Sequence, residues 1–509
     1  MAHFIKLVNQ GLTPIRNFNP RLMSYNVEMT EITGGTFWKA YTEGQIAGTE
    51  DFPKIDSFTN HTALAGLMQY YPPIDLYNAK VRALAKELGT VWVRVSGTWA
   101  TKTYYDFDGT TGGKAPEGYQ SVLTRDQWVG VIDFCRHIGA KLLVSASNCA
   151  GDHKDDGPLD LTQIKKLFAL TDSVGGKIDA FEFMNEPNML QVSGAPLNYN
   201  FEDYIRDQDI ANAWVRENYP ECLIVGPCNT GMVDDKPAGE DNPMEKMGSG
   251  MGNMMKMGTV HDLMRGHKVP MNVYSYHYYN GISERLASVM PQGHWPAEAA
   301  HTDAYLAVAP STCRMNVPAR DKYVPGGEMW VTESGDAGGG GDTWASTYLD
   351  VLRTLNELGS FVTITDGVIF HNTLASSDYG FLQHGTFDPR PNYFAVLLWQ
   401  RLVGNTCYKT LNPGVEGAHV YCHSRKDGKP GYCYLVINNS LTDVTTVGIP
   451  AKGEIYVLSG NGNMRSKVMY LNGNPLEFDK KGKLPKLEGK KVKAGAYEIP
   501  AGSCAFIVV

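Results

Sequence analysis

The strongest constraint on the fold is a repeated alternation of short apolar segments with longer amphipathic ones. Eight segments are short, rich in β-branched or aromatic residues, and bounded by Gly, Pro, Asn or Asp, as strands are. They cover residues 22–28, 91–95, 141–147, 180–185, 222–226, 272–279, 329–333 and 367–372. Between most of them lie helical patterns, one of which begins after the expected N-cap Thr124.

These strand–helix units favour a (β/α)8 barrel, an α/β TIM-barrel fold, over an open doubly wound sheet. An open sheet with a nucleotide site normally has a Gly-rich turn after its first strand. Residues 32–35 do not form such a turn. The segment 281–327 is rich in Pro, and its pattern is less clear. We therefore expect a catalytic barrel over residues 21–400.

After about residue 400 the pattern changes to short strands separated by Gly, Asn, Asp and Lys turns. No helical segment interrupts these strands, which is typical of an antiparallel β-sandwich. The sequence thus predicts a sandwich domain over residues 401–509. The lysine-rich stretch 475–495 within it is expected to be a solvated loop or hairpin.

Composition excludes several classes of partner. The 509 residues include 46 Lys and Arg against 54 Asp and Glu, a formal charge of −8 that gives no footprint for nucleic acid or an anionic membrane. No apolar run approaches the roughly 18 residues that span a bilayer. No signal peptide is visible, but a removed one would leave no trace, so localisation and oligomeric state stay open. The nine cysteines form no CxxC pair, and we expect buried thiols with at most one or two disulfides.

Two glutamates close predicted barrel strands. Glu186 follows the fourth strand in an Asn-Glu-Pro sequence, and Glu333 ends the seventh. Reactive side chains of such barrels project from the C-terminal strand ends, where partial burial is expected to raise the pKa of a carboxyl group. A single buried Glu is more simply the partner of an Arg. Two facing carboxyl groups about 5–5.5 Å apart, however, are the minimum apparatus of a retaining glycoside hydrolase.

The neighbours of the two glutamates suggest separate roles. Asn185 can bind the sugar hydroxyl beside the reacting carbon, which makes Glu186 the general acid/base and Glu333 the nucleophile. His277 and Tyr279, at the end of the sixth strand, are expected to hydrogen-bond Glu333 and keep it ionised. No metal or organic cofactor is required for this chemistry.

Several motifs together resemble glycoside hydrolase family 79, which comprises β-glucuronidases and heparanase. Asn-Glu-Pro after a fourth strand and Glu after a seventh mark only the larger clan of retaining glycosidases with this barrel. The stretches that carry the closer likeness are 24–29, 93–100, 132–148, 181–188, 275–281, 331–341 and 377–404, of which ESGDAGGGG and FDPRPNYF are the most specific. The resemblance implies that an N-terminal strand within residues 1–20 completes the sandwich.

The resemblance also implies how the substrate is held. The backbone N–H groups of Gly339 and Gly340 and the hydroxyl of Tyr379 would bind the carboxylate of a uronic acid, as Gly-rich turns and neutral donors can. Glu28 and Thr98 fall where the family binds sugar hydroxyls. This sequence departs from the family at residue 338, where a Gly replaces the common Tyr. The basic patches of a heparan-sulfate cleft are also not apparent.

These patterns predict a carbohydrate-active enzyme, a retaining β-glucuronidase that hydrolyses β-linked glucuronic acid from glycoconjugates or oligosaccharides by double displacement. Two alternatives stay open: a heparanase-like endo-β-glucuronidase acting on glycosaminoglycans, and a related β-glycosidase acting on neutral sugars. The Met-rich segment 234–258 is expected to be a packed loop, or otherwise a lid. Residues 152–156 carry metal-compatible groups but no established ligand spacing.

Overall fold

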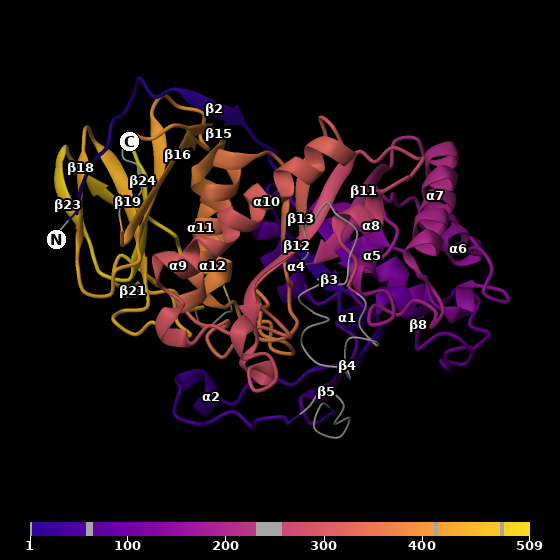
Figure 1. Cartoon of the computed structure of the whole chain (residues 1–509). Helices are drawn as coiled ribbons and strands as arrows, with labels where there is room; N and C mark the ends of the chain where they lie inside the picture. Colours follow the sequence, from indigo (N-terminus) through magenta and orange to yellow (C-terminus); the bar gives the residue numbers. More distant parts are fainter. Residues whose placement is uncertain (1–2, 57–64, 231–256, 412–415, 479–482) are drawn as a thin grey trace.

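The computed structural model describes residues 3–56, 65–230, 257–411, 416–478 and 483–509. The predicted Met-rich segment therefore lies almost wholly outside the described residues. Two bodies share the chain: a closed barrel ringed by helices and a β-sandwich beside it (Figure 1). Among the described residues, no helix is long and apolar enough to cross a membrane.

Eight parallel strands close the barrel in the order of the sequence, which confirms the predicted (β/α)8 fold. The strands are β3 (Met23–Glu28), β6 (Trp92–Ser96), β9 (Lys141–Ser145), β10 (Ala180–Glu182), β11 (Leu223–Thr230), β12 (Val273–Ile282), β13 (Glu328–Gly338) and β14 (Ile369–His371). Each overlaps a predicted segment, but β10 and β14 are shorter than predicted, and β11, β12 and β13 continue beyond their segments at their C-terminal ends.

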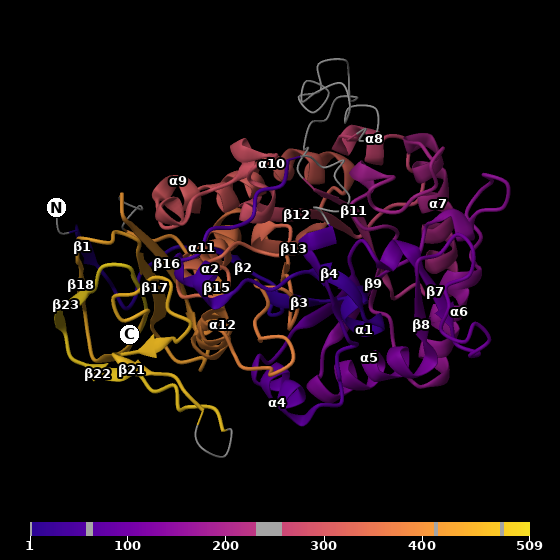
Figure 2. The same ribbon diagram turned by 90° about the horizontal axis from the view of Figure 1, so that it is seen from below.

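Helices surround the barrel strands on all sides in the view from below (Figure 2). The principal ones are α4 (Ala79–Glu87), α5 (Arg125–Ile138), α6 (Thr162–Ser173), α7 (Phe201–Asn218), α8 (Val260–Met264), α10 (Val308–Tyr323), α11 (Leu349–Ile364) and α12 (Pro391–Leu402). Thr124 caps α5 as predicted, because its side chain accepts a hydrogen bond from the N–H of Gln127. The unclear segment 281–327 forms α10, the short α9 (Asp303–Leu306) and single 3₁₀ turns.

Shorter elements build the rim of the barrel at the C-terminal strand ends. They are α1 (Met29–Thr33), α2 (Glu43–Ala47), the hairpin of β4 (Gly35–Trp38) with β5 (Met68–Tyr71), and the parallel pair β7 (Thr103–Asp106) and β8 (Ser121–Thr124). Single turns follow several strands, namely η1 (Ala100–Lys102), η2 (Ala150–Asp152), η3 (Pro187–Met189), η5 (Glu284–Leu286), η6 (Pro291–Gly293) and η7 (Ala297–Ala299).

The sandwich has two sheets and includes the N-terminal segment. One sheet holds β2 (Pro14–Asn17), β15 (Val403–Tyr408), β16 (Ala418–Arg425), β17 (Tyr432–Asn438), β24 (Ser503–Val508), β19 (Gly453–Ser459), β20 (Tyr470–Leu471), β21 (Asn474–Pro475) and β22 (Lys490–Val492). The other holds β1 (His3–Lys6), β18 (Thr445–Ile449) and β23 (Gly495–Ile499). Pairing is antiparallel throughout except between β1 and β18, which run parallel, unlike the uniform pattern that the sequence suggested.

The cysteines contribute to the core as predicted: all nine are buried free thiols. Their burial raises the pKa of thiols such as Cys135 and Cys433 to about 12. These side chains therefore pack as small apolar groups.

Candidate active site

A cavity of about 530 Å³ opens at the C-terminal ends of the barrel strands. Its walls combine apolar side chains, such as Trp38, Trp99 and Leu286, with a few polar groups. Eight of the ten residues expected to form the site line it, namely Glu28, Thr98, Asn185, Glu186, Tyr279, Glu333, Gly339 and Tyr379. His277 lies behind this wall, in contact with both catalytic candidates.

Local backbone features turn the two glutamates into the cavity. Glu333 lies within β13 at a point where the register with both neighbouring strands shifts, which is a bulge. Glu186 lies four residues beyond the end of β10 and has left-handed dihedral angles, φ 46° and ψ 53°, before Pro187 begins η3. A non-glycine residue in this region is strained and usually needs support from its surroundings. Here the hydroxyl of Ser193 donates a hydrogen bond of 2.8 Å to the carbonyl oxygen of Glu186.

The two carboxyl groups lie close together across the cavity. One oxygen of Glu186, one oxygen of Glu333 and one ring nitrogen of His277 all lie within 4.8 Å of one another. The side chain of Glu186 is 14% exposed and that of Glu333 is 7% exposed, so both meet the cavity from partly desolvated positions. This separation is close to the 5–5.5 Å or so of retaining glycosidases and well short of the roughly 6.5–9.5 Å that leaves room for a water.

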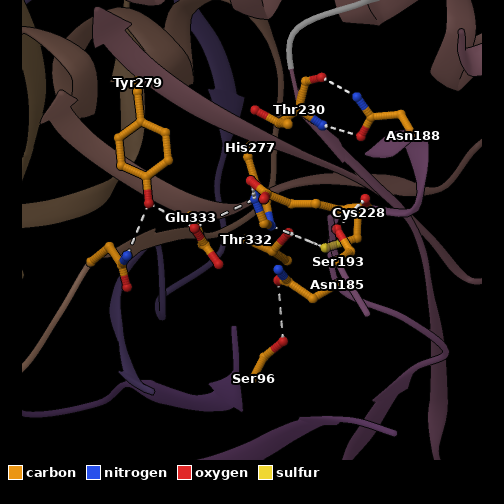
Figure 3. Close-up of polar contacts among 12 residues, drawn as sticks. Ser96, Asn185, Asn188, Ser193, Cys228, Thr230, His277, Tyr279, Thr332 and Glu333 are labelled. Atoms are coloured by element: carbon orange, nitrogen blue, oxygen red, sulfur yellow. Dashed lines mark hydrogen bonds and ion pairs between the residues drawn. The ribbon is translucent and has the colours of Figure 1, made fainter. Parts of the chain in front are cut away.

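Three side chains surround the carboxylate of Glu333 with donors, of which Tyr279 and His277 are drawn in Figure 3. Tyr279 donates its hydroxyl proton at 2.6 Å, Arg94 donates from Nη1 at 3.1 Å, and His277 Nδ1 lies 3.5 Å away. Burial alone would raise the pKa of Glu333, but the cations His277 and Arg94 and the Tyr279 hydroxyl bring it below its ordinary value. The sequence expectation that burial would raise the pKa of this carboxyl is therefore wrong, because the neighbouring cations outweigh the loss of solvent.

His277 makes its shorter contact with Glu186 rather than with Glu333. Its Nδ1 lies 2.9 Å from Glu186 Oε1, so the ring that was expected to hydrogen-bond Glu333 instead bridges the two carboxyl groups. Burial would lower the pKa of His277, yet the acceptors around it, Cys228, Glu333 and Glu186, raise that pKa well above its ordinary value. The pattern of residues placed His277 at the right strand end but could not show which oxygen it faces.

Arg94 is the principal residue that the sequence analysis missed. It lies on β6, its side chain is 1% exposed, and its Nη2 donates at 2.8 Å both to Glu182 and to the amide oxygen of Asn185. The latter contact leaves the amide NH2 of Asn185 available to a sugar hydroxyl. A signal was present in the sequence, because Arg94 is the one charged residue in the apolar run VWVRV. A buried cation in a strand needs anionic partners at the same depth.

Glu28 forms a second acidic position beside the nucleophile candidate. Burial together with the negative charges of Glu333 and Glu31 raises its pKa well above the ordinary range, and burial also raises the pKa of Glu31 to about 8. This shift favours the protonated form of Glu28, which can donate as well as accept a hydrogen bond with a sugar hydroxyl. A glycine is required at Gly97, where φ is +89° and a Cβ would overlap the Glu28 carboxyl group.

A network of neutral donors occupies the side of the cavity near β14. Asn372, also missed in the sequence, donates from Nδ2 to the hydroxyl oxygens of Tyr279 at 2.9 Å and Tyr379 at 3.2 Å. Burial raises the pKa of Tyr379 well above its ordinary value, so this phenol keeps its proton. Among the described residues, no side chain accepts a hydrogen bond from the Tyr379 hydroxyl. Tyr379 also lines the cavity. It can therefore donate to a substrate oxygen.

The Gly-rich turn after β13 contributes less of the wall than expected. Gly339 lines the cavity, but Gly340 is not among the lining residues. The Cα of Gly340 packs on Trp38, and a Cβ there would come within 2.6 Å of the Trp38 Cβ. Gly340 therefore packs against β4, and the anion contact expected of its N–H stays a prediction.

Glu186, His277 and Glu333 are also the one group of three or more potential metal ligands that lies close together within the described residues. The set fits a metal poorly, because Arg94 already supplies a cation to the same Glu333 carboxylate. At residues 152–156, Asp152 instead accepts hydrogen bonds from Tyr119 at 2.8 Å and Ser147 at 3.1 Å. Asp152 therefore serves the structure of its loop.

Comparisons with known proteins agree with the predicted resemblance. No protein-family model matches the chain. It is 32% identical over 165 residues to baicalin-β-D-glucuronidase of Scutellaria baicalensis, a match that covers 31% of each chain. It is 25% identical over 436 residues to heparanase-like protein 1 of Arabidopsis thaliana, covering 76% of this chain and 74% of that one.

A solved structure supports the same fold. The 4-O-α-L-rhamnosyl-β-D-glucuronidase from Fusarium oxysporum superposes with a TM-score of 0.64 over 99% of this chain and 100% of that one, at 11% identity. At so low an identity the likeness speaks for the barrel and sandwich alone.

Proposed function

We propose that this chain, a relative of the heparanase-like and β-glucuronidase proteins, is a retaining β-glucuronidase. The observation that carries the proposal is the pair Glu186 and Glu333, whose carboxyl oxygens lie within 4.8 Å of each other at the mouth of one cavity. The spacing suits formation of a covalent glycosyl-enzyme rather than direct attack by water.

Their surroundings support separate roles. Glu333, whose pKa is lowered by His277 and Arg94 despite its burial, is ionised and can attack the anomeric carbon to form an ester. Glu186 then gives its proton to the leaving oxygen and, in the second step, takes a proton from the water that cleaves the ester. Asn185 and protonated Glu28 bind hydroxyls of the same sugar ring.

The preference for a glucuronic acid rests on Tyr379 and Gly339. Tyr379 directs a hydroxyl proton into the cavity, and the N–H of Gly339 can join it, so a sugar carboxylate would be bound by neutral donors. A hydrogen bond to a charged group is worth about 1.5–3 kcal/mol. That energy corresponds to roughly a ten- to hundredfold preference for the acid over the neutral sugar.

The first test compares 4-nitrophenyl β-D-glucuronide with the corresponding glucoside and xyloside. We expect the glucuronide to be cleaved with the highest kcat/KM, and a Tyr379→Phe variant to lose at least about tenfold on the glucuronide but little on the glucoside. Cleavage of the neutral glycosides alone would overturn the assignment of the sugar. The products from a defined glucuronide-terminated oligosaccharide would then distinguish removal of terminal residues from heparanase-like internal cleavage.

The second test addresses the mechanism. Glu333→Ala should lower turnover by several orders of magnitude, and added azide should restore part of it by forming the α-glucuronyl azide. The matched variant Glu328→Ala removes a carboxylate from the opposite end of the same strand and should retain turnover. If Glu333→Ala kept most of its activity, another residue would have to be the nucleophile.

A further inference from the structure

Cys228 occupies an unusual backbone position directly beneath the catalytic pair. The register between β11 and β12 shifts between Pro227 and Asn229, so Cys228 is the extra residue of a bulge. Its φ is +60°, a left-handed value that a non-glycine residue rarely adopts, and its N–H donates to Ser275 Oγ at 3.0 Å. Bulges of this kind re-aim a side chain, and strain at such a position is typical of functional sites.

The bulge points the thiol of Cys228 at the back of the His277 ring (Figure 3). Sγ lies 3.0 Å from His277 Nε2, while the other ring nitrogen, Nδ1, lies 2.9 Å from Glu186 Oε1. Arg94 Nη2 donates to the same sulfur at 3.3 Å, and Thr332 Oγ1 lies 3.8 Å away. Cys228 is fully buried, so solvent does not compete for these contacts.

We propose that Cys228 is a positioning residue that keeps the Nδ1 proton of His277 directed at Glu186 in both charge states of the ring. The inference rests on the proposed role of Glu186 as general acid/base. A thiol is both a weak donor and a weak acceptor. It can give its S–H to Nε2 when the ring is neutral and accept Nε2–H when the ring is cationic, and in both cases Nδ1 bears a proton.

This arrangement suits a group beside a residue that changes charge twice in each turnover. When Glu186 gives its proton to the leaving oxygen, it becomes a carboxylate and accepts a stronger hydrogen bond from Nδ1–H. When Glu186 takes a proton back from water, that bond weakens again. The Nδ1 proton stays on His277 throughout, so the ring orients the acid/base without entering the proton balance.

Charged or titratable groups face His277 from several barrel strands. They are Arg94 on β6, Glu186 after β10, Cys228 on β11 and Glu333 on β13, with Glu182 held against Arg94. Burial raises the pKa of the Cys228 thiol, which supports a neutral S–H in the resting enzyme. A carboxylate in its place would hold the ring as an imidazolium to higher pH.

The direct test is the tautomer of His277, which does not depend on turnover. In protein labelled with ¹⁵N-histidine, the ring signals that disappear in His277→Gln belong to His277. Once the ring has lost its extra proton at alkaline pH, we expect them to report a proton on Nδ1 in the wild type and in Cys228→Ser, whose hydroxyl also donates and accepts. Cys228→Ala should show a mixture of tautomers. An Nε2–H tautomer in the wild type, or a signal unchanged in Cys228→Ala, would overturn the inference.

The second test is the alkaline limb of the kcat/KM profile for an alkyl β-D-glucuronide, whose poor leaving group needs the acid. Cys228→Ala lets part of the neutral His277 lose its Nδ1 proton, the donor that favours the carboxylate form of Glu186, so the limb should move up by about half a pH unit. Cys228→Asp should fix a cation beside Glu186 and move the limb down by a similar amount. Cys228→Ser should restore the wild-type profile.

Controls separate this role from packing and from the proposed function. Cys222→Ala removes a buried thiol just before the same strand and should leave the tautomer and the alkaline limb unchanged. Two outcomes would reduce the role of Cys228 to packing alone. One is that Cys222→Ala changes the tautomer and the alkaline limb as much as Cys228→Ala does. The other is that Cys228→Ala and Cys228→Asp shift the alkaline limb in the same direction. A wild type inactive on glucuronides, with the expected tautomers intact, would contradict the substrate but support the inference.

Discussion

Arg94 sets the charge balance beneath the cavity at the scale of single residues. Its guanidinium contacts Glu333, Glu182 and Asn185, so one buried cation orients the proposed nucleophile and the amide that precedes the proposed acid. Without Arg94, the buried carboxylates of Glu182 and Glu333 would lose a cationic partner. Removing one partner of a buried ion pair typically lowers the free energy of unfolding by about 3–5 kcal/mol. The active site and the barrel core therefore share this residue.

Replacing Arg94 should change the pH dependence in a defined direction. Arg94 lowers the pKa of Glu333, so Arg94→Met should raise it, and the nucleophile would then be ionised only at higher pH. We expect the acid limb of kcat/KM to move up by about one pH unit or more, measured on 4-nitrophenyl β-D-glucuronide. Arg94→Lys, which keeps a charge, should move it less. An acid limb unchanged in Arg94→Met would contradict the electrostatic role.

The role of Glu186 is tested by the leaving group. Glu186→Ala should lower kcat/KM by about 10²–10⁴-fold on an alkyl β-D-glucuronide, since the alkoxide needs a proton to leave. On 4-nitrophenyl β-D-glucuronide, whose phenolate leaves readily, the first step should suffer far less. Measuring both substrates with the same variant provides an internal control. Equal losses on the two would mean that Glu186 does not act as the proton donor.

Sequence reasoning located the residues that end strands but not those that meet across the barrel. Glu186 and Glu333 could be found because each directly follows an apolar strand. Arg94, Asn372 and Cys228 matter because of contacts with residues 239, 93 and 49 positions away, and no local pattern encodes those contacts. The shorter contact of His277, with Glu186, was missed for the same reason.

At the scale of elements, the turn between β6 and η1 determines where Glu28 lies. Gly97 adopts φ +89° there, and the Glu28 carboxyl group fills the space that a side chain would need. Other glycines on the barrel, such as Gly139 at the end of α5, also have positive φ but face open space. The two sites thus share backbone strain and differ in steric contact.

This difference gives a matched pair of variants. Gly139→Ala should cost about 1 kcal/mol of stability through its left-handed backbone and leave activity intact. Gly97→Ala should carry a similar backbone cost and also displace Glu28, so we expect kcat/KM to fall at least about tenfold, with KM affected. Thermal unfolding and steady-state kinetics on both variants separate the two effects. Equal activity in both variants would argue against a role of Glu28 in binding.

Hydrophobic periodicity predicted the elements well and their ends poorly. Eight apolar segments correspond to the eight barrel strands, because buried parallel strands are short and apolar on both faces. The extensions of β12 to Ile282 and of β13 to Gly338 contain polar and glycine residues that read as loop. Register shifts earlier in the same strands, at Tyr276–His277 in β12 and opposite them in β13, turn Glu333 toward the cavity.

At the scale of the whole molecule, one hydrophobic core joins the barrel to the sandwich. Helix α11 has all residues from Leu349 to Val362 buried and lies between the two bodies (Figure 1). Sandwich residues such as Leu435 and Phe506 belong to the same cluster of buried side chains as barrel residues such as Phe181. Polar bonds cross the junction as well, including that from the Tyr421 hydroxyl to Asn356 at 2.7 Å.

This shared core predicts cooperative unfolding of the two bodies. We expect a single calorimetric transition for the full chain, because separating the sandwich would expose α11 and leave its polar groups unpaired. Tyr421→Phe should lower that single midpoint without splitting it. Two resolved transitions would show that the bodies unfold independently. The pattern change near residue 400 indicated where the sandwich begins but not how tightly it is attached.

The most direct measurement of the central claim is to trap the covalent intermediate. A 2-deoxy-2-fluoro-β-D-glucuronyl fluoride should label the enzyme once, because the fluorine at C2 slows hydrolysis of the ester more than its formation. We expect mass spectrometry of the digested protein to find the sugar on the peptide that contains Glu333, and Glu333→Gln to take up no label. A label on any other residue, or release of the α-anomer as the first product, would contradict the account.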